Sequence, residues 1–221
     1  MKPLLTIPDL IRSATTFCET ESRNNHRELI GVTDGKHVGT YIEHKFKSML
    51  LQTYDVEIGN SASGIDLPGT SIETDIKVTS ISQPQSSCPY KNGRQKVFGL
   101  GYNLLVFVYR KNDIGRTKCC LHFDYCTFIK KERTADYTTT ASLRDMIAHG
   151  ANKEDIVGFL QDRQIPGDEI VYNALADEIL ATPPQQGYLT ISNALQWRLQ
   201  YKRVIELNNT VEGISNYAWQ A

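Results

Sequence analysis

The sequence predicts an α/β protein in which helices flank a sheet and a helical region follows at the C-terminal end. Three observations lead to this fold class: a helical pattern over residues 37–53, strand patterns between residues 72 and 128, and helical patterns after residue 138. A chain of 221 residues, 40% of them apolar, can bury one sizeable core. We therefore expect one domain, alone or with an appendage, and a loose boundary near residues 130–140.

The first expected element is an amphipathic helix from His37 to about Thr53. Its apolar residues recur at steps of three and four, which places them on one helix face: Val38, Ile42, Phe46, Met49 and Leu50. Gly35 marks the loop before this helix. Residues 54–64 begin like a short strand and end in a turn rich in glycine and serine.

Three strands are expected next. Over residues 72–79 the side chains alternate between two faces, with Ile72, Thr74, Ile76 and Val78 on one and Glu73, Asp75, Lys77 and Thr79 on the other. Residues 104–109 form a continuous apolar run that suits a strand buried on both faces. Residues 119–128 have a similar character and predict the third strand.

The C-terminal part of the sequence predicts four helices. They cover residues 140–149, 153–161, 168–180 and 190–201. Glycine and proline separate them, since these residues interrupt or end helices.

Composition excludes several protein classes. The 24 basic and 25 acidic side chains leave a net charge of −1, so no overall positive field indicates a nucleic-acid partner. No run of 18 apolar residues is present and no signal-peptide stretch follows Met1, so we expect a soluble cytoplasmic protein without a membrane partner. Five cysteines without a C-x-x-C spacing favour neither disulfides nor structural zinc.

The chemically informative residues lie in two neighbouring pieces, residues 64–68 and residues 73–77. Hydrolysis of a phosphodiester needs a divalent cation, an activated water and relief of the charge on the phosphoryl oxygens. Asp66 and Asp75 can supply the one or two carboxylates that Mg²⁺ usually takes from a protein, and the backbone carbonyl of Ile76 can add a third oxygen. Lys77 shares a strand face with Asp75, so its ammonium can reach the attacking water or the phosphate.

Asp66, eight intervening residues and then Asp75-Ile76-Lys77 resemble the PD-(D/E)XK motif of type II restriction endonucleases. Ile65 stands where that motif often has proline. The resemblance covers residues 35–110. It implies a restriction-endonuclease-like core, a central mixed β-sheet flanked by helices, within residues 1–135. The resemblance does not extend to the mainly helical residues 136–221, which we expect to serve DNA recognition, dimerisation or both and to be integrated with the core.

The resemblance also implies an activity: Mg²⁺-dependent, sequence-specific hydrolysis of double-stranded DNA. The enzyme would act as a homodimer, so that two identical sites address both strands of a symmetric sequence. Its setting would be the prokaryotic cytoplasm, with a methyltransferase as the companion enzyme. In similar nucleases a glutamate on the first core helix faces the metal site, and Glu43 matches that place. Glu73 could substitute as a ligand.

Other interpretations stay open for the same residues. Asp75 and Lys77 could form an exposed ion pair, Asp66 could cap a turn, and Glu43 and Glu73 could face solvent. The alternative functions are a repair, recombination or RNA-processing nuclease on the same core, and a DNA-binding module without catalysis.

Two segments are candidates for DNA contact because they are rich in amide and cationic donors. The first follows the catalytic strand and contains Gln83, Gln85, Ser86, Ser87, Lys91, Asn92, Arg94, Gln95 and Lys96. The second is the polar stripe of the last predicted helix, with Asn193, Gln196, Gln200 and Arg203. A surface loop without a special role and an ordinary packing helix, or a dimer contact, are the alternatives.

Overall fold

A computed structural model of the chain describes residues 2–59, 64–87, 92–192 and 198–219. Its centre is a mixed four-stranded sheet in the order β1-β3-β4-β7. The strands are β1 (Thr74–Ser80), β3 (Asn103–Ile114), β4 (Lys118–Ile129) and β7 (Ile214–Ala218). β1 runs parallel to β3, whereas β3–β4 and β4–β7 are antiparallel. The three predicted strands are therefore confirmed, and β1 lies at an edge of the sheet.

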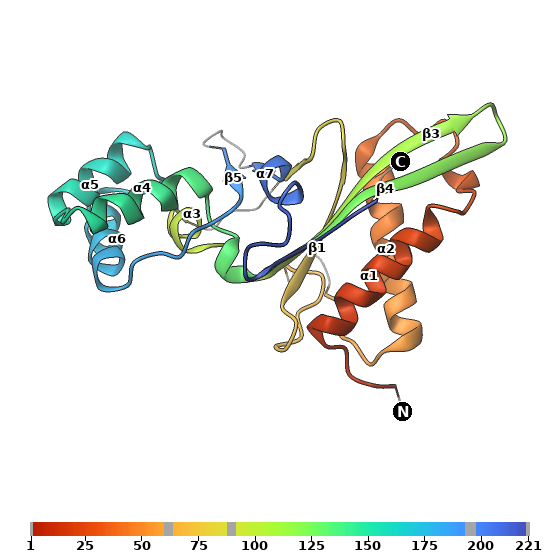
Figure 1. The fold of residues 1–221 in the computed structure, drawn as a ribbon, viewed down its shortest axis with the longest axis horizontal. Coiled ribbons are helices and arrows are strands. Elements are labelled where there is room, and N and C mark those ends of the chain that lie inside the picture. Colours follow the sequence, from red (N-terminus) through yellow and green to blue (C-terminus); the bar gives the residue numbers. More distant parts are fainter. Residues whose placement is uncertain (1, 60–63, 88–91, 193–197, 220–221) are drawn as a thin grey trace.

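Two helices, α1 (Ile7–Glu21) and α2 (Gly35–Thr53), cover one face of this sheet (Figure 1). The predicted helix over 37–53 is confirmed, while α1 has no counterpart among the expected elements. α2 begins at Asp34, whose carboxylate accepts hydrogen bonds from the N–H groups of Lys36 and His37. Its buried stripe is Val38, Ile42, Phe46 and Leu50. The same four-residue period that predicted the helix thus decides which side of it meets the sheet.

Aromatic rings join these helices to the sheet. Phe107 of β3 lies 5.1 Å from Phe46 of α2, 5.7 Å from Phe17 of α1 and 6.0 Å from Phe123 of β4, measured between ring centroids. The rings meet edge-on or tilted, the arrangement that favours contact between aromatic quadrupoles. All four rings belong to the first hydrophobic core.

The opposite face of the sheet is covered by a small three-stranded antiparallel sheet in the order β2-β6-β5. Its strands are β2 (Gln85–Ser87), β6 (Arg198–Gln200) and β5 (Thr190–Ile191), and the short helix α7 (Lys202–Ile205) follows. These elements form a second core with Val106 and Val108 of β3.

The helix predicted over residues 190–201 is wrong, because residues 190–191 and 198–200 are strands; residues 193–197 lie outside the described part. Its apolar spacing also fits two strands. Ile191 and Leu199 pair across β5 and β6 and are both buried in the second core. Tertiary packing therefore overrides a pattern that locally resembles a helix.

Four helices gather at one end of the molecule, away from the projecting β3–β4 hairpin (Figure 1). They are α3 (Arg94–Phe98), α4 (Tyr137–Ala148), α5 (Lys153–Asp162) and α6 (Glu169–Ala181), and they share a third core. The last three confirm the helices predicted over 140–149, 153–161 and 168–180. Asp136, Asn152 and Asp168 cap their N-termini.

Single-turn 3₁₀ helices lie at Arg27–Leu29 and Lys131–Arg133. The strand-like start expected for residues 54–64 is wrong, since Asp55 makes only an isolated bridge with Leu4. No helix in the described ranges is long and apolar enough to cross a membrane.

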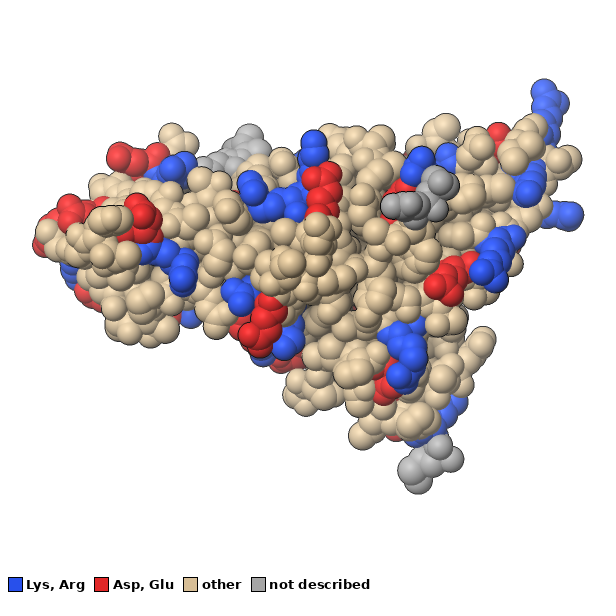
Figure 2. Space-filling view, in the orientation of Figure 1, with Lys and Arg blue, Asp and Glu red and all other residues tan. Residues whose placement is uncertain are grey.

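Charges are mixed over the visible surface rather than gathered in one field. On the face drawn in Figure 2, basic and acidic side chains are interspersed among uncharged ones, in keeping with the net charge of −1, and several basic ones lie near the far end of the β3–β4 hairpin. Any attraction for a polyanion must therefore be local.

Candidate active site

Asp75 and Lys77 stand on one face of β1, as the strand period predicts. The Lys77 Nζ lies 2.7 Å from Asp75 Oδ2, and only 7% of the Asp75 side chain and 20% of the Lys77 side chain are exposed. This is not the exposed surface pair that one alternative describes. Burying an ion pair costs free energy unless its geometry is good. The short contact and low exposure of Asp75 and Lys77 therefore indicate that the pair holds a fixed position on the strand.

Asp66 is brought to the same place by the chain segment before β1. The backbones of Leu67 and Thr74 exchange two hydrogen bonds of 2.9 and 3.0 Å. The Ile76 N–H then donates to Asp66 Oδ2 over 2.8 Å, and the Asp66 and Asp75 carboxyls lie within hydrogen-bond reach of each other. The two carboxyl groups that the sequence predicts as metal ligands therefore meet at the open edge of β1.

Ile76 contributes through its backbone. In an extended strand, the N–H and C=O of one residue point to the same side. Since the Ile76 N–H points to Asp66, its carbonyl also points to the free edge of the sheet. This orientation suits the predicted third oxygen ligand.

A lysine that the sequence analysis did not single out completes the cluster. Lys47 Nζ lies 2.7 Å from Glu43 Oε1 and 2.5 Å from Asp66 Oδ1, and 12% of its side chain is exposed. Glu43 and Lys47 are four residues apart on α2, the spacing at which helix side chains pair. That spacing was the available signal for Lys47. Glu43 therefore faces the cluster, with the ammonium of Lys47 between it and Asp66.

Glu73 does not join the cluster. Its φ of 31° lies in the left-handed region, and β1 begins only at Thr74. Its carboxylate pairs with Lys131 Nζ at 3.0 Å. The expected sharing of a face with Asp75 is wrong, because the turn before the strand breaks the alternation.

The proximity of the carboxyl groups perturbs their acidity. Burial raises the pKa of Asp75 to about 7; the hydrogen bond with Asp66 adds to this rise, and the Lys77 ammonium opposes it. Burial also acts to raise the pKa of Asp66, but hydrogen bonds with Asp75, Lys47 and the Ile76 N–H lower it below its usual value. Two adjacent carboxyls with opposite pKa shifts are a natural pair for a divalent cation, whose positive charge can take the place of a proton.

The donors suit a hard cation. Two carboxylates and a backbone carbonyl are oxygen ligands, and Mg²⁺ usually binds through one or two carboxylates while keeping several waters. Within the described ranges, no three side chains of histidine, cysteine, aspartate or glutamate gather as a metal cage. The residues at the edge of β1 therefore fit a partly hydrated ion rather than a fully enclosed one.

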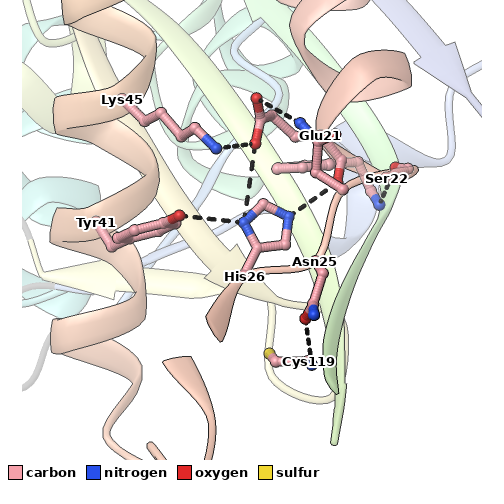
Figure 3. Close-up of polar contacts among 9 residues, drawn as sticks. Glu21, Ser22, Asn25, His26, Tyr41, Lys45 and Cys119 are labelled. Carbon is pink, nitrogen blue, oxygen red and sulfur yellow. Dashed lines mark hydrogen bonds and ion pairs between the residues drawn. The ribbon is translucent and has the colours of Figure 1, made fainter. Parts of the chain in front are cut away.

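A second polar cluster holds α2 from its other flank (Figure 3). His26 is buried; its Nε2 lies 2.8 Å from the Glu21 carbonyl oxygen and therefore carries the proton, and its Nδ1 lies 3.3 Å from the Tyr41 hydroxyl. The Glu21 carboxylate accepts from Lys45 Nζ over 2.5 Å. Tyr41 and Lys45 alternate along α2 with Glu43 and Lys47. This cluster ties α2 to the end of α1 and to the segment that follows it.

The predicted DNA-contacting residues fall into separate groups. Gln85, Ser86 and Ser87 form β2 and Gln200 lies opposite on β6, whereas Gln83 and Asn92 are exposed outside helices and strands. Lys91, Asn193 and Gln196 lie outside the described residues.

Four other predicted residues have structural partners. Arg94 pairs with Glu178, and the Gln95 amide donates to the Leu100 carbonyl. Lys96 is buried, and burial lowers its pKa. The Arg203 guanidinium stacks 3.8 Å from the centre of the Tyr137 ring. The structure thus does not bring the predicted DNA contacts together on one surface.

The family model for the type II restriction enzyme NspV matches residues 4–216. The chain belongs to the NspV family. The type II restriction enzyme NspV of Nostoc sp. is 53% identical over 213 residues, which cover 96% of each chain. No solved structure matches. As a member of the NspV family, this protein is a type II restriction endonuclease that acts on DNA, which confirms the predicted class of enzyme; the roles of Asp66, Asp75 and Lys77 stay predictions. Among the alternatives, a module without catalysis and a repair or RNA-processing nuclease are disfavoured.

Proposed function

We propose that this endonuclease hydrolyses phosphodiester bonds of double-stranded DNA with Mg²⁺ held by Asp66, Asp75 and the Ile76 carbonyl. The observation that supports this assignment most strongly is the adjacent pair of carboxyls with the Lys77 ammonium 2.7 Å from Asp75. When held by these residues, Mg²⁺ would supply Lewis acidity and would stabilise negative charge on the phosphoryl oxygens.

In this proposal, Lys77 acts through its positive charge. Its ammonium is fixed by Asp75 on a strand rather than on a mobile loop. From there it can orient the attacking water and neutralise charge that develops on the phosphate. Glu43 acts indirectly, through Lys47. The Lys47 ammonium donates hydrogen bonds to the carboxylates of both Glu43 and Asp66. Glu43 and Lys47 are thus positioning residues for the first ligand.

We further infer a homodimer, because two copies of one site related by a two-fold axis can address both strands of a symmetric sequence. Residues 1–135 would carry the catalytic core. Residues 136–221 would serve recognition and dimerisation while packing against that core, and the enzyme would act in the prokaryotic cytoplasm.

The test compares cleavage with binding. Asp75→Ala and Lys77→Ala should each slow single-turnover cleavage of a plasmid in Mg²⁺ by about 10²- to 10³-fold, with DNA affinity largely kept. Removal of Mg²⁺ with EDTA should stop wild-type cleavage, and added Mg²⁺ should restore it. Mapping the ends of the plasmid fragments should give one recurrent sequence.

Lys111→Ala is a matched control, since Lys111 also pairs at 2.7 Å with an aspartate two residues away on a strand. It should leave the single-turnover rate unchanged. Full activity in Asp75→Ala or Lys77→Ala would remove the proposed roles, and unchanged activity in EDTA would remove the cation.

A further inference from the structure

The small sheet carries a polar face that the proposed catalytic residues do not use. Across β2 and β6, Gln85 pairs with Gln200 and Ser87 pairs with Arg198. Directly opposed residues of an antiparallel pair point to the same face, and so do residues two apart along a strand. All four side chains therefore share one face of these two strands, here called the β2–β6 ribbon, while the two-residue strand β5 pairs with the other edge of β6. Ser87, Arg198 and Gln200 are exposed and Gln85 is half-buried.

The other face of the ribbon is anchored in the protein. Leu199 is fully buried in the second core. Its partner across the strands is Ser86, whose hydroxyl oxygen lies 2.6 Å from the Tyr201 hydroxyl oxygen. A slip of one residue would bury Arg198 and Gln200 and expose Leu199, so the register is strongly specified. The polar face therefore has a fixed orientation.

The β2–β6 ribbon is tied directly to the catalytic strand. Thr79 lies on the same face of β1 as Lys77, two residues further on, which is about 7 Å along a strand. The Thr79 hydroxyl oxygen lies 3.1 Å from the Gln85 N–H, from which it accepts, and 3.0 Å from the Gln85 carbonyl. The Tyr201 N–H donates to the Pro84 carbonyl over 2.8 Å. A duplex with a phosphate at Lys77 would thus meet the ribbon beside the scissile bond.

The chemistry of this face fits the edges of base pairs. Arginine bonds bidentately to guanine and glutamine to adenine in the major groove, which is wide enough to admit a two-stranded ribbon. The ribbon carries Arg198 and two glutamines and has no acidic side chain on β2 or β6. Within the described ranges, the Arg198 guanidinium and the Gln200 amide have no protein partner, so their donors are available to a ligand.

From these observations we infer that the β2–β6 ribbon is the base-reading element of the enzyme and that it enters the major groove. Arg198, absent from the predicted contacts, is its guanine-reading residue, and Gln200 reads the neighbouring base pair. This inference rests on the proposed cleavage of duplex DNA. It assigns specificity to a ribbon rather than to the helix that the sequence pattern indicates for this segment.

The experiment first identifies the cleaved sequence with the wild-type enzyme in Mg²⁺. Binding is then measured in EDTA for the cognate duplex, for every duplex with one symmetric base-pair change, and for an unrelated duplex. Arg198→Ala should weaken cognate binding by about 10- to 100-fold and abolish discrimination at a single symmetric position. Gln200→Ala should do the same at a different position.

Two further variants distinguish base recognition by Arg198 from the effect of its positive charge and from altered folding. Arg198→Lys keeps the charge but not the bidentate fork, so it should bind the unrelated duplex as the wild type does and still lose discrimination. Arg12→Ala removes an exposed arginine of α1 that pairs with Asp9 instead, and it should leave the sequence preference intact. Equal melting temperatures of all variants would show that folding is preserved.

The outcomes separate the two proposals. Equal weakening of all duplexes by Arg198→Ala would make Arg198 a phosphate contact, and unchanged discrimination in both Arg198→Ala and Gln200→Ala would remove the ribbon from base reading. Either result leaves wild-type cleavage untouched. Wild-type protein that cuts no discrete sequence in Mg²⁺ would instead contradict the proposed function itself.

Discussion

Lys47 links two segments of the proposed site. Its ammonium joins Glu43 of α2 to Asp66, which lies in a different segment of the chain. Burial acts to lower the pKa of Lys47, yet its hydrogen bonds with Asp66 and Glu43 raise it. Lys47 is therefore a permanent positive charge next to the proposed metal ligand, and its loss should loosen that ligand.

Lys47→Met should reduce the affinity for Mg²⁺ and the cleavage rate by about 10- to 100-fold, the usual effect of losing a residue that orients a metal ligand. Calorimetric titration of Mg²⁺ and single-turnover cleavage measure the two effects. Lys47→Arg, which keeps charge and donors, should recover part of both. Lys45→Met is the control from the opposite flank of α2 and should alter neither directly; equal losses in both variants would point to a purely structural role.

Asp75 should make the metal-free protein sensitive to pH. Its pKa of about 7 in the folded protein is higher than the value near 4 of an unfolded chain, so the folded state binds the proton more tightly. The stability that this proton contributes is complete below about pH 4 and is lost as the pH rises towards 7.

The comparison is the thermal midpoint of wild type and Asp75→Asn in EDTA at pH 5 and pH 8. The thermal midpoint of Asp75→Asn should rise relative to that of the wild type between pH 5 and pH 8, because the amide never carries the buried charge. An equal difference between the two midpoints at both pH values would contradict the assigned protonation.

Strand parity is sufficient to place Asp75 and Lys77 together on one face of β1. Glu73 fails the same rule, because its left-handed backbone ends the alternation one residue before β1. The pairing of Lys47 with Asp66 joins residues nineteen positions apart. Local periodicity cannot predict a contact between segments so far apart in the chain. The four-residue spacing of Glu43 and Lys47 does predict that these two side chains pair with each other.

Among the elements, the segment before β1 depends on Gly59. Its N–H donates to the Asp66 carbonyl over 2.8 Å, and a Cβ at this position would lie 2.0 Å from the Ile65 carbonyl oxygen. A methyl group there must displace backbone, so the segment that presents Asp66 would move.

Gly59→Ala should therefore destabilise the protein by about 1–3 kcal/mol and reduce cleavage more than it reduces DNA binding. Urea denaturation and single-turnover rates test this. Gly158→Ala is the opposite case: it lies inside α5 with open space around its Cα, and it should stabilise by about 0.5–1 kcal/mol. A fully active Gly59→Ala protein would mean that Asp66 tolerates displacement.

Element prediction succeeded where one period ran for several turns and failed where elements were short. α2 and α4 to α6 were expected from their apolar patterns and capping residues. β5 and β6 hold only two and three residues, too few to display a period of two. Their strand character comes from pairing with each other and with β2, which lies more than a hundred residues away.

For the molecule as a whole, the first core supports the central sheet and both segments of the proposed site. Phe107→Ala should cost about 3–5 kcal/mol of unfolding free energy, because it removes a fully buried ring in contact with three others. Guanidinium denaturation gives the value. Tyr217→Ala on β7, with 42% of the residue exposed, should cost far less. Similar losses in the two variants would show that the aromatic cluster does not dominate stability.

The sequence indicated the class of the whole molecule but not its assembly. A helix, strands and a helical region follow in the expected order. What no local pattern revealed is that the last strand, β7, returns to β4 in the central sheet and that the small sheet combines distant segments. Such contacts are decided by which apolar surfaces remain uncovered once the nearer elements have packed.

The distance along the chain between β2 and β6 has a consequence for biosynthesis. The proposed hydrolytic side chains all belong to the first 77 residues, whereas the pairing partner of β2 begins only at residue 198. A nascent polypeptide that leaves the ribosome early, or a product of premature termination, therefore has no β6 and no β7 to close the sheet. Under the ribbon assignment, such a product cannot select a target, and site-directed cutting begins only with the completed chain.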